Sequence, residues 1–201
     1  MNTLQGMNNT GFKIRNQYLP HFVTFTVVGW VDIFTRKQCR DILIENLKYC
    51  IAHKGLLLYG YVIMSNHIHA IMAVEENTNG LSYFIRDFKS YTSKQLMNWM
   101  LSTNKESRVD WMTSIFQNFA LKTYKNDSFQ IWTNYNHPVI TTEMDIFNQK
   151  LNYIHNNPVK AGIVRKPEDY LYSSASNYAG FKDNLLDVII VDHWSNTGLI
   201  R

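Results

Sequence analysis

The sequence predicts a single α+β domain with an antiparallel sheet, extra helices and an irregular C-terminal tail. Its 201 residues are enough for one domain of ordinary size, and 45% of them are hydrophobic, which is ample for a packed core. Strand-like and helix-like segments alternate along the chain. Two neighbouring apolar runs are joined by a tight turn, which favours antiparallel pairing.

The first part of the chain contains a strand, a helix and a hairpin. "HFVTFTVVGW", from His21, is rich in β-branched and aromatic residues and predicts the first strand. Residues 35–53 carry apolar side chains at helical spacing and stop before Gly55, which predicts an amphipathic helix. "LLLYGYVIM" and "HIHAIMAV" are separated by "SN" and predict two antiparallel strands.

The second part supplies the remaining helices and one more strand. Residues 81–101 have one apolar face and predict a second helix, and "RVDWMTSIFQNFALKTY" predicts an inserted one. "FQIW" or "HPVI" supplies the last strand. A helix from about Glu143 is expected to end at Pro158, because the residue before proline disfavours the α region. This order is the βαββαβ pattern of a ferredoxin-like sandwich.

Two histidines lie within the apolar run "YVIMSNHIHAIMAV". On a strand, His67 and His69 project from the same face, so their imidazoles can converge on one metal ion. Neutral imidazole binds Mn²⁺, Co²⁺ or Zn²⁺, and contributes to Mg²⁺ sites when oxygen ligands complete the shell. A pair of histidines on a half-buried strand also occurs without a metal, bonded to a neighbour or to water. A metal role therefore needs further ligands on the same face.

The helix "LNYIHNNPVKAG" offers such groups. Tyr153 and Asn157 are four residues apart, so they share one helix face beside the apolar stripe. The alternative is a tyrosine with a buried ring and a wet hydroxyl, and an asparagine that only ends the helix. Other side chains compete for the roles of nucleophile and ligand, namely Tyr91, Tyr124, Tyr135, His155 and Asn156.

At these residues the sequence resembles a known family. "GYVIMSNHIHAIM" is similar to the histidine-hydrophobic-histidine (HUH) motif of the single-tyrosine, IS200-like transposases. "YIHNNPVKAGIV" followed by "DYLYSSASNY" resembles the C-terminal block of their REP-associated branch. The resemblance extends from about Tyr18 to Tyr178 and implies a ferredoxin-like fold. The segment from about Asn104 to Thr123 is longer than in small members.

The resemblance also implies a chemistry. His67, His69 and Asn157 would hold a divalent metal, Mg²⁺ or Mn²⁺, and Tyr153 would be the catalytic nucleophile. Family members cut single-stranded DNA, often beside a hairpin, and rejoin it through a 5′-phosphotyrosine intermediate. A tyrosine hydroxyl is a poor nucleophile at neutral pH, so the metal would assist its attack on the phosphodiester. We therefore expect a DNA transposase that acts as a monomer or a homodimer.

Charge and length add three expectations. The formal charge of +4 favours a polyanionic partner without requiring one. No apolar run is long enough for a signal peptide or a membrane span, so we expect a cytoplasmic protein without membrane association. Candidate DNA-binding cations lie on the second helix and after the last one, at Arg86, Lys89, Lys160, Arg165 and Lys166.

The expected organisation is a flexible lead-in at residues 1–17, an HUH transposase domain at 18–164 and a C-terminal tail at 165–201. Two rival interpretations remain open at this point. One is a non-catalytic DNA-binding repressor or domesticated relic on the same fold, and the other is a structural metal site in an unrelated α/β domain. The presence of all four expected side chains favours the enzyme.

Overall fold

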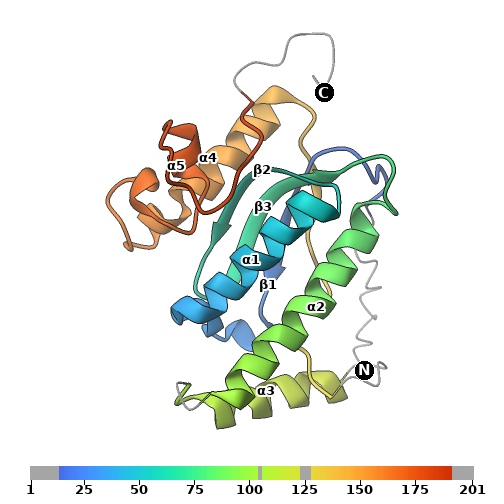
Figure 1. Cartoon of the computed structure of the whole chain (residues 1–201), viewed down its shortest axis with the longest axis vertical. Helices are drawn as coiled ribbons and strands as arrows, with labels where there is room; N and C mark the ends of the chain where they lie inside the picture. The colour runs from blue at the N-terminus through green and yellow to red at the C-terminus, as the bar shows by residue number, and fades with distance from the viewer. Residues whose placement is uncertain (1–13, 104–105, 123–127, 192–201) are drawn as a thin grey trace, which may run out of the picture.

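A four-stranded antiparallel sheet forms the centre of the computed structural model, which describes residues 14–103, 106–122 and 128–191 (Figure 1). The strand order is β2-β3-β1-β4, and every neighbouring pair is antiparallel. This order and the alternation with helices confirm the predicted ferredoxin-like α+β fold. The strands are β1 (His21–Thr26), β2 (Leu56–Ile63), β3 (His67–Val74) and β4 (Val139–Ile140).

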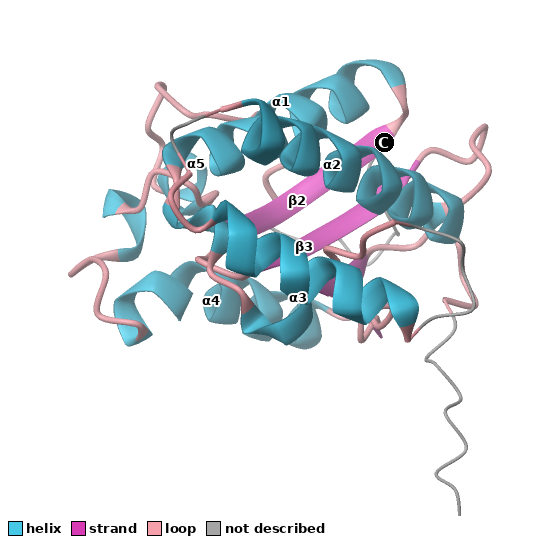
Figure 2. Ribbon diagram, turned by 90° about the horizontal axis from the view of Figure 1, so that it is seen from below, coloured by secondary structure: helices cyan, strands magenta, loops and turns pink. Residues whose placement is uncertain are grey.

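Helices lie on both faces of the sheet. The helices α1 (Lys37–His53) and α2 (Leu81–Ser102) cover one face, and α4 (Met144–Lys160) lies on the other (Figure 2). The inserted helix α3 (Val109–Leu121) follows α2, as the sequence predicts. Four short helical turns complete the fold: η1 (Val28–Trp30), η2 (Ile33–Thr35), η3 (Pro167–Asp169) and α5 (Ala175–Tyr178).

Both candidate segments for the last strand pair with β1. "HPVI" supplies β4, whose Val139 and Ile140 pair with the start of β1. "FQIW" contributes a single bridge between Trp132 and Val27, beyond the end of β1. The edge of the sheet is therefore shared between two short pieces, which explains why neither has the length of a usual strand.

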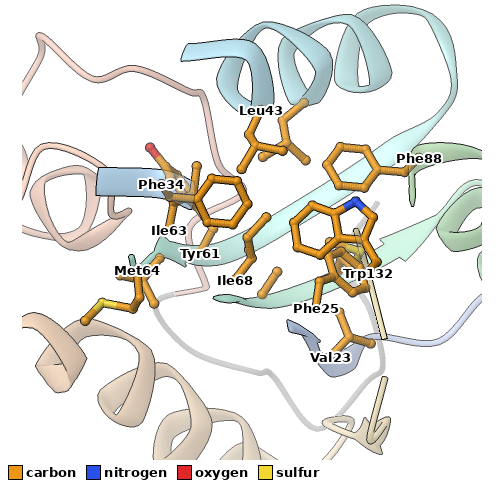
Figure 3. Close-up of a cluster of buried hydrophobic side chains, with 14 of the residues drawn as sticks. Val23, Phe25, Phe34, Leu43, Tyr61, Ile63, Met64, Ile68, Phe88 and Trp132 are labelled. Atoms are coloured by element: carbon orange, nitrogen blue, oxygen red, sulfur yellow. The ribbon is translucent and has the colours of Figure 1, made fainter. Parts of the chain in front are cut away.

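The main core lies between the sheet and the two helices α1 and α2. Phe25, Ile68, Leu43 and Phe88 meet there, and Trp132 fills the space beside them (Figure 3). Trp132 is 4% exposed, and its indole N–H donates to Thr92 Oγ1 at 3.0 Å. Trp132 is therefore a core residue, and its indole is not available for stacking on a ligand.

The helix α4 continues past Pro158, contrary to the sequence prediction. Proline lacks one N–H, so it removes only the bond that this N–H would make with the preceding turn. The last turn is completed by Ala161, whose N–H donates to Asn157 O at 3.0 Å, and by Ile163, whose N–H donates to Pro158 O at 2.9 Å. Gly162 then ends the helix with a φ of 72°, a left-handed conformation that suits glycine.

Gly60 lets α4 approach β2 closely. The pairing of β2 with β3 shifts register between Leu58 and Gly60, and a Cβ at Gly60 would lie only 2.7 Å from Leu151 Cδ1 of α4. A second link is the buried hydrogen bond of 2.9 Å between His155 Nε2 of α4 and Ser174 Oγ. Ser174 Oγ also accepts from the backbone N–H of Tyr61 in β2 at 2.9 Å. These contacts fix the position of α4 over the sheet.

The chain after α4 returns along the free edge of β2. The N–H of Ile63 donates to Tyr172 O at 2.9 Å, and the N–H of Ser174 donates to Tyr61 O at 3.0 Å. The hydroxyl of Tyr170 donates to Ile63 O at 2.8 Å. As predicted, the segment after α4 has little regular secondary structure, but it packs on the sheet. Within the described ranges, no helix is long and apolar enough to cross a membrane.

A buried carboxylate attaches the beginning of α3 to the rest of the domain. The side chain of Glu106 is fully buried, and it accepts hydrogen bonds from Arg108 Nε at 2.8 Å and Arg36 Nε at 3.4 Å. Arg108 also donates to the backbone carbonyl of Asp32 at 3.2 Å. The Arg108 guanidinium lowers the pKa of Glu106 to about 2.

Replacing Glu106 by Gln should lower the free energy of unfolding by about 2 kcal/mol at neutral pH, because the two guanidinium groups lose a buried counter-charge. The carboxylate is more acidic folded than unfolded, so its stabilisation is complete above about pH 4.5 and declines toward about pH 2. Urea unfolding of both proteins across this range measures the effect. The control Glu45→Gln, in an exposed pair with Lys48, should change stability by less than about 0.5 kcal/mol. A difference for Glu106→Gln that stays constant with pH would contradict the assignment.

Replacing Gly60 by Ala should destabilise the fold by about 1–3 kcal/mol, because the new methyl group overlaps Leu151. Combining it with Leu151→Val, which removes the overlapping atom, should restore part of the loss. Thermal unfolding of the single and double variants measures both effects. If the double variant is destabilised by the sum of the two single effects, the close approach is not the cause.

Candidate active site

The two histidines of β3 lie side by side on the face of the sheet that α4 covers. The ring centroids of His67 and His69 are 4.7 Å apart. They face the end of β1, where Thr26 pairs with His67 and Thr24 pairs with His69. The period of two along a strand therefore places both imidazoles as the sequence predicts.

The imidazole of His69 is held from three sides. Its Nδ1 lies 2.8 Å from Thr24 Oγ1, and its Nε2 lies 3.3 Å from the hydroxyl of Tyr153. The ring of Phe22 stacks against it at 5.3 Å. Burial, and then the charges of His67 and Lys150, lower the pKa of His69 to about 3. The ring is therefore neutral, which is the form that binds metal ions.

The imidazole of His67 is oriented by the residue before it. Asn66 Nδ2 donates to the backbone carbonyl of Trp30 at 3.2 Å, so Asn66 Oδ1 faces His67 Nδ1 at 2.7 Å. An amide oxygen only accepts, so Nδ1 of His67 carries the proton and Nε2 keeps its lone pair. Burial lowers the pKa of His67. An N–H bonded in this way is the usual support of a metal-binding histidine.

Tyr153 reaches the histidines from α4. Its ring centroid lies 5.0 Å from His69 and 6.0 Å from Phe22, while 42% of the residue stays exposed. The Tyr153 hydroxyl lies 3.3 Å from Nε2 of His69, whose Nδ1 contacts Thr24 Oγ1 on the other side of the ring. The hydroxyl is thus both positioned by the site and open to a substrate from outside.

Asn157 lies one turn further along α4 and is half-buried. Within the described part of the chain, no hydrogen bond joins its side chain to either histidine. The two alternatives on this helix are engaged elsewhere. His155 is buried against Ser174, and burial lowers its pKa to about 4. Asn156 Nδ2 donates to Asn152 O at 2.9 Å.

The competing tyrosines lie away from the histidines or outside the described residues. Tyr91 is 55% exposed on α2, which covers the opposite face of the sheet. Tyr135 is 40% exposed in the loop before β4, with its ring 6.3 Å from that of His137. Tyr124 lies outside the described residues.

Two lysines of α4 flank the tyrosine. Lys150 Nζ lies 5.1 Å from the centre of the Phe22 ring, and Lys160 Nζ lies 5.8 Å from that of Tyr153. Lys160 is a predicted DNA-binding residue, whereas sequence reasoning missed Lys150. The feature that indicates Lys150 in the sequence is its position three residues before Tyr153, which places both side chains on the same helix face.

The other predicted DNA-binding cations lie elsewhere on the surface. Arg86 is exposed on α2 and pairs with Asp87 at 2.8 Å. Lys89 donates to Thr133 O at 2.9 Å and to Asn136 Oδ1, which attaches α2 to the loop before β4. Arg165 and Lys166 are exposed just after α4. Contact of these residues with DNA stays a prediction.

The ligands available for a metal are few. Within residues 14–103, 106–122 and 128–191, no three side chains of the types His, Cys, Asp and Glu are close enough to hold an ion. Nε2 of His69 faces Tyr153 of α4, and amide or hydroxyl oxygens of this helix would have to complete the shell. This donor set of two imidazoles and neutral oxygens fits a divalent ion that keeps open positions for water or phosphate.

Comparisons with known proteins agree with this geometry. The family described as transposase IS200 like matches residues 16–137, which include both histidines and end before α4. A Haemophilus influenzae protein named as a REP-associated tyrosine transposase is 29% identical over 112 residues. That alignment spans 56% of this chain and 54% of the relative, about half of its length.

A solved structure shares the fold. It is that of a REP-associated tyrosine transposase bound to a REP hairpin, with a TM-score of 0.55 and 16% identity over 94% of this chain and 98% of the other. The sequence match covers more than half of the chain and contains the histidine pair. The protein therefore belongs to the IS200-like transposase family.

Proposed function

We propose that the protein is a metal-dependent enzyme that nicks single-stranded DNA and transfers the strand through a 5′-phosphotyrosine at Tyr153. The observation that carries the proposal is the contact between Tyr153 and His69, which are 84 residues apart in the chain and 3.3 Å apart at their polar atoms. A nucleophile beside a metal-binding pair is what phosphodiester transfer requires. The fold thus brings the two segments together on one face of the sheet.

The proposed ligands are Nε2 of His67, Nε2 of His69 and the amide oxygen of Asn157. A divalent ion such as Mg²⁺ or Mn²⁺, when bound there, would withdraw charge from the scissile phosphate. Asn66 fixes His67 in the required tautomer, and the contact with Thr24 holds Nδ1 of His69. Both Nδ1 atoms are thereby engaged away from the ion, which leaves the two Nε2 atoms to bind it.

In the proposed reaction the Tyr153 oxygen attacks phosphorus, and the bond from phosphorus to the 3′ oxygen breaks. The phenolic proton is released and the 3′ oxygen leaves as a hydroxyl, so no cofactor is consumed. A 3′-hydroxyl of another strand can reverse the step and release the tyrosine. Lys150 and Lys160, on either side of Tyr153, would offset the negative charge of the phosphate.

The proposed substrate is single-stranded DNA next to a hairpin. A polar groove between α2 and residues 128–136, which includes Arg86 and Lys94, suits a phosphate backbone. It adjoins the histidine site through β1, because Asn136 O accepts from the N–H of Thr24 at 2.9 Å. The structural relative that holds a REP hairpin supports the same class of ligand.

Tyr153→Phe should abolish the covalent protein–DNA adduct, because phenylalanine lacks the attacking oxygen. The assay incubates a labelled single-stranded oligonucleotide with the protein and Mn²⁺ and separates the products on a denaturing gel. Tyr91→Phe is the matched control, since it removes an exposed hydroxyl on the opposite face, and it should form as much adduct as the wild type.

An adduct that persists in Tyr153→Phe would overturn the assignment of the nucleophile. If the wild-type protein binds DNA but forms no adduct with either metal, the non-catalytic alternative, a DNA-binding repressor or relic, replaces the enzyme.

Thr24→Val and Asn66→Ala should each weaken Mn²⁺ binding by roughly 10- to 100-fold, because each removes the hydrogen-bond partner that holds Nδ1 of one histidine. Isothermal titration with Mn²⁺ in the absence of DNA measures this independently of cleavage. Thr35→Val, an exposed threonine before α1, is the control and should bind as the wild type does. Equal affinities in all four proteins would show that Thr24 and Asn66 do not support a metal site at the histidine pair.

A further inference from the structure

One exposed aromatic side chain beside the histidines has no role in the proposed chemistry. Trp30 is 67% exposed, although an indole of this size is usually kept largely out of water. Its ring centroid lies 6.2 Å from that of His67, and the two rings are inclined by 68°. Trp30, His67, His69 and Tyr153 therefore form a row of four neighbouring rings, with Trp30 and Tyr153 at its ends.

The backbone presents Trp30 in a conformation that tryptophan rarely adopts. Its φ is 55°, in the left-handed region, and it follows Gly29 at 63°. A bulky residue in this conformation is strained, and such strain persists where the surroundings hold it and often marks a functional site. The strain would be relieved by glycine at no steric cost.

The surroundings of Trp30 are well defined. Its N–H donates to Val27 O at 3.2 Å, and its carbonyl accepts from Asn66 Nδ2 at 3.2 Å. Below it, a Cβ at Gly29 would lie 3.2 Å from Ile115 Cγ2, so the turn rests closely on α3. The same Asn66 orients His67, so the position of the indole and that of the imidazole are set by one side chain.

We propose that Trp30 is a stacking platform for one unpaired base of the DNA strand, within a few nucleotides of the phosphate that Tyr153 attacks. This inference rests on the proposed function and adds the residue that distinguishes a single strand from a duplex. An exposed indole can cover the face of any base, whereas a paired base already has neighbours on both faces. Trp30 thus selects for unpaired substrate next to the metal ligands without reading its sequence.

Trp30→Gly separates stacking from folding. Glycine removes the indole and relieves the backbone strain, so the variant should unfold at the same temperature as the wild type or higher. Its affinity for a fluorescently labelled single-stranded oligonucleotide should fall by roughly 5- to 100-fold, the range for one lost base–aromatic stack. Anisotropy titrations in the Tyr153→Phe background measure binding without cutting. Trp30→Phe should retain most of the affinity.

Tyr49→Ala is the control, since it removes a 54% exposed aromatic ring from α1 on the opposite face of the sheet. It should leave the affinity unchanged. A series of oligonucleotides with one abasic position each then locates the stacked base. One abasic position should weaken binding to the Trp30 protein and have no effect on binding to Trp30→Gly, as expected if base and indole interact only with each other.

The outcomes separate the inference from the proposed function. Equal affinity of Trp30 and Trp30→Gly proteins for the single strand would overturn the stacking platform and leave the role of Tyr153 intact. Loss of affinity in Trp30→Gly, together with an absence of adduct in the wild type, would support the platform and reject the enzyme. A wild-type protein that does not bind single-stranded DNA would overturn both.

Discussion

The site depends on how closely α4 approaches β2. Gly60 provides the space for Leu151, and the bond between His155 and Ser174 holds the helix next to this contact. Because side chains on one helix keep fixed relative positions, this contact also sets the distance from Tyr153 to His69. The chain after α4 contributes through Ser174, so the final segment of the fold helps to position the nucleophile.

Nε2 of His69 can bind one partner at a time, and two groups can take that place. In the structure the Tyr153 hydroxyl lies 3.3 Å from it. A metal ion at the proposed site would need the lone pair of the same nitrogen, so binding of the ion and release of the hydroxyl from His69 are linked. Burial keeps the imidazole neutral, which leaves the lone pair available to either partner. The contact with His69 thus positions the Tyr153 hydroxyl, and binding of the ion to Nε2 would release this hydroxyl for attack on the phosphate.

The features of the fold and of the site that could be predicted from the sequence are those that depend on local periodicity. A repeat of two places His67 and His69 on one face, a spacing of four places Tyr153 and Asn157 on one helix face, and the order of apolar segments gives the fold. Contacts between segments that are far apart in the chain leave no such periodic pattern in the sequence. The bonds of Thr24 to His69 and of Asn66 to Trp30 depend on strand register and on a turn whose positive φ follows from tertiary packing. The continuation of α4 past Pro158 likewise depends on how its last turn is closed.

The inserted helix α3 has a structural reason to be present. Its beginning is fixed to the domain by the buried Glu106, and its side chain Ile115 supports the turn at Gly29 from below. A strained turn needs a rigid support, because without one the chain relaxes to a conformation that suits tryptophan better. The helix lies beside the sheet and contributes none of the proposed ligands. The insertion therefore supports the turn that carries Trp30, whose indole lies beside His67 at the end of the row of rings.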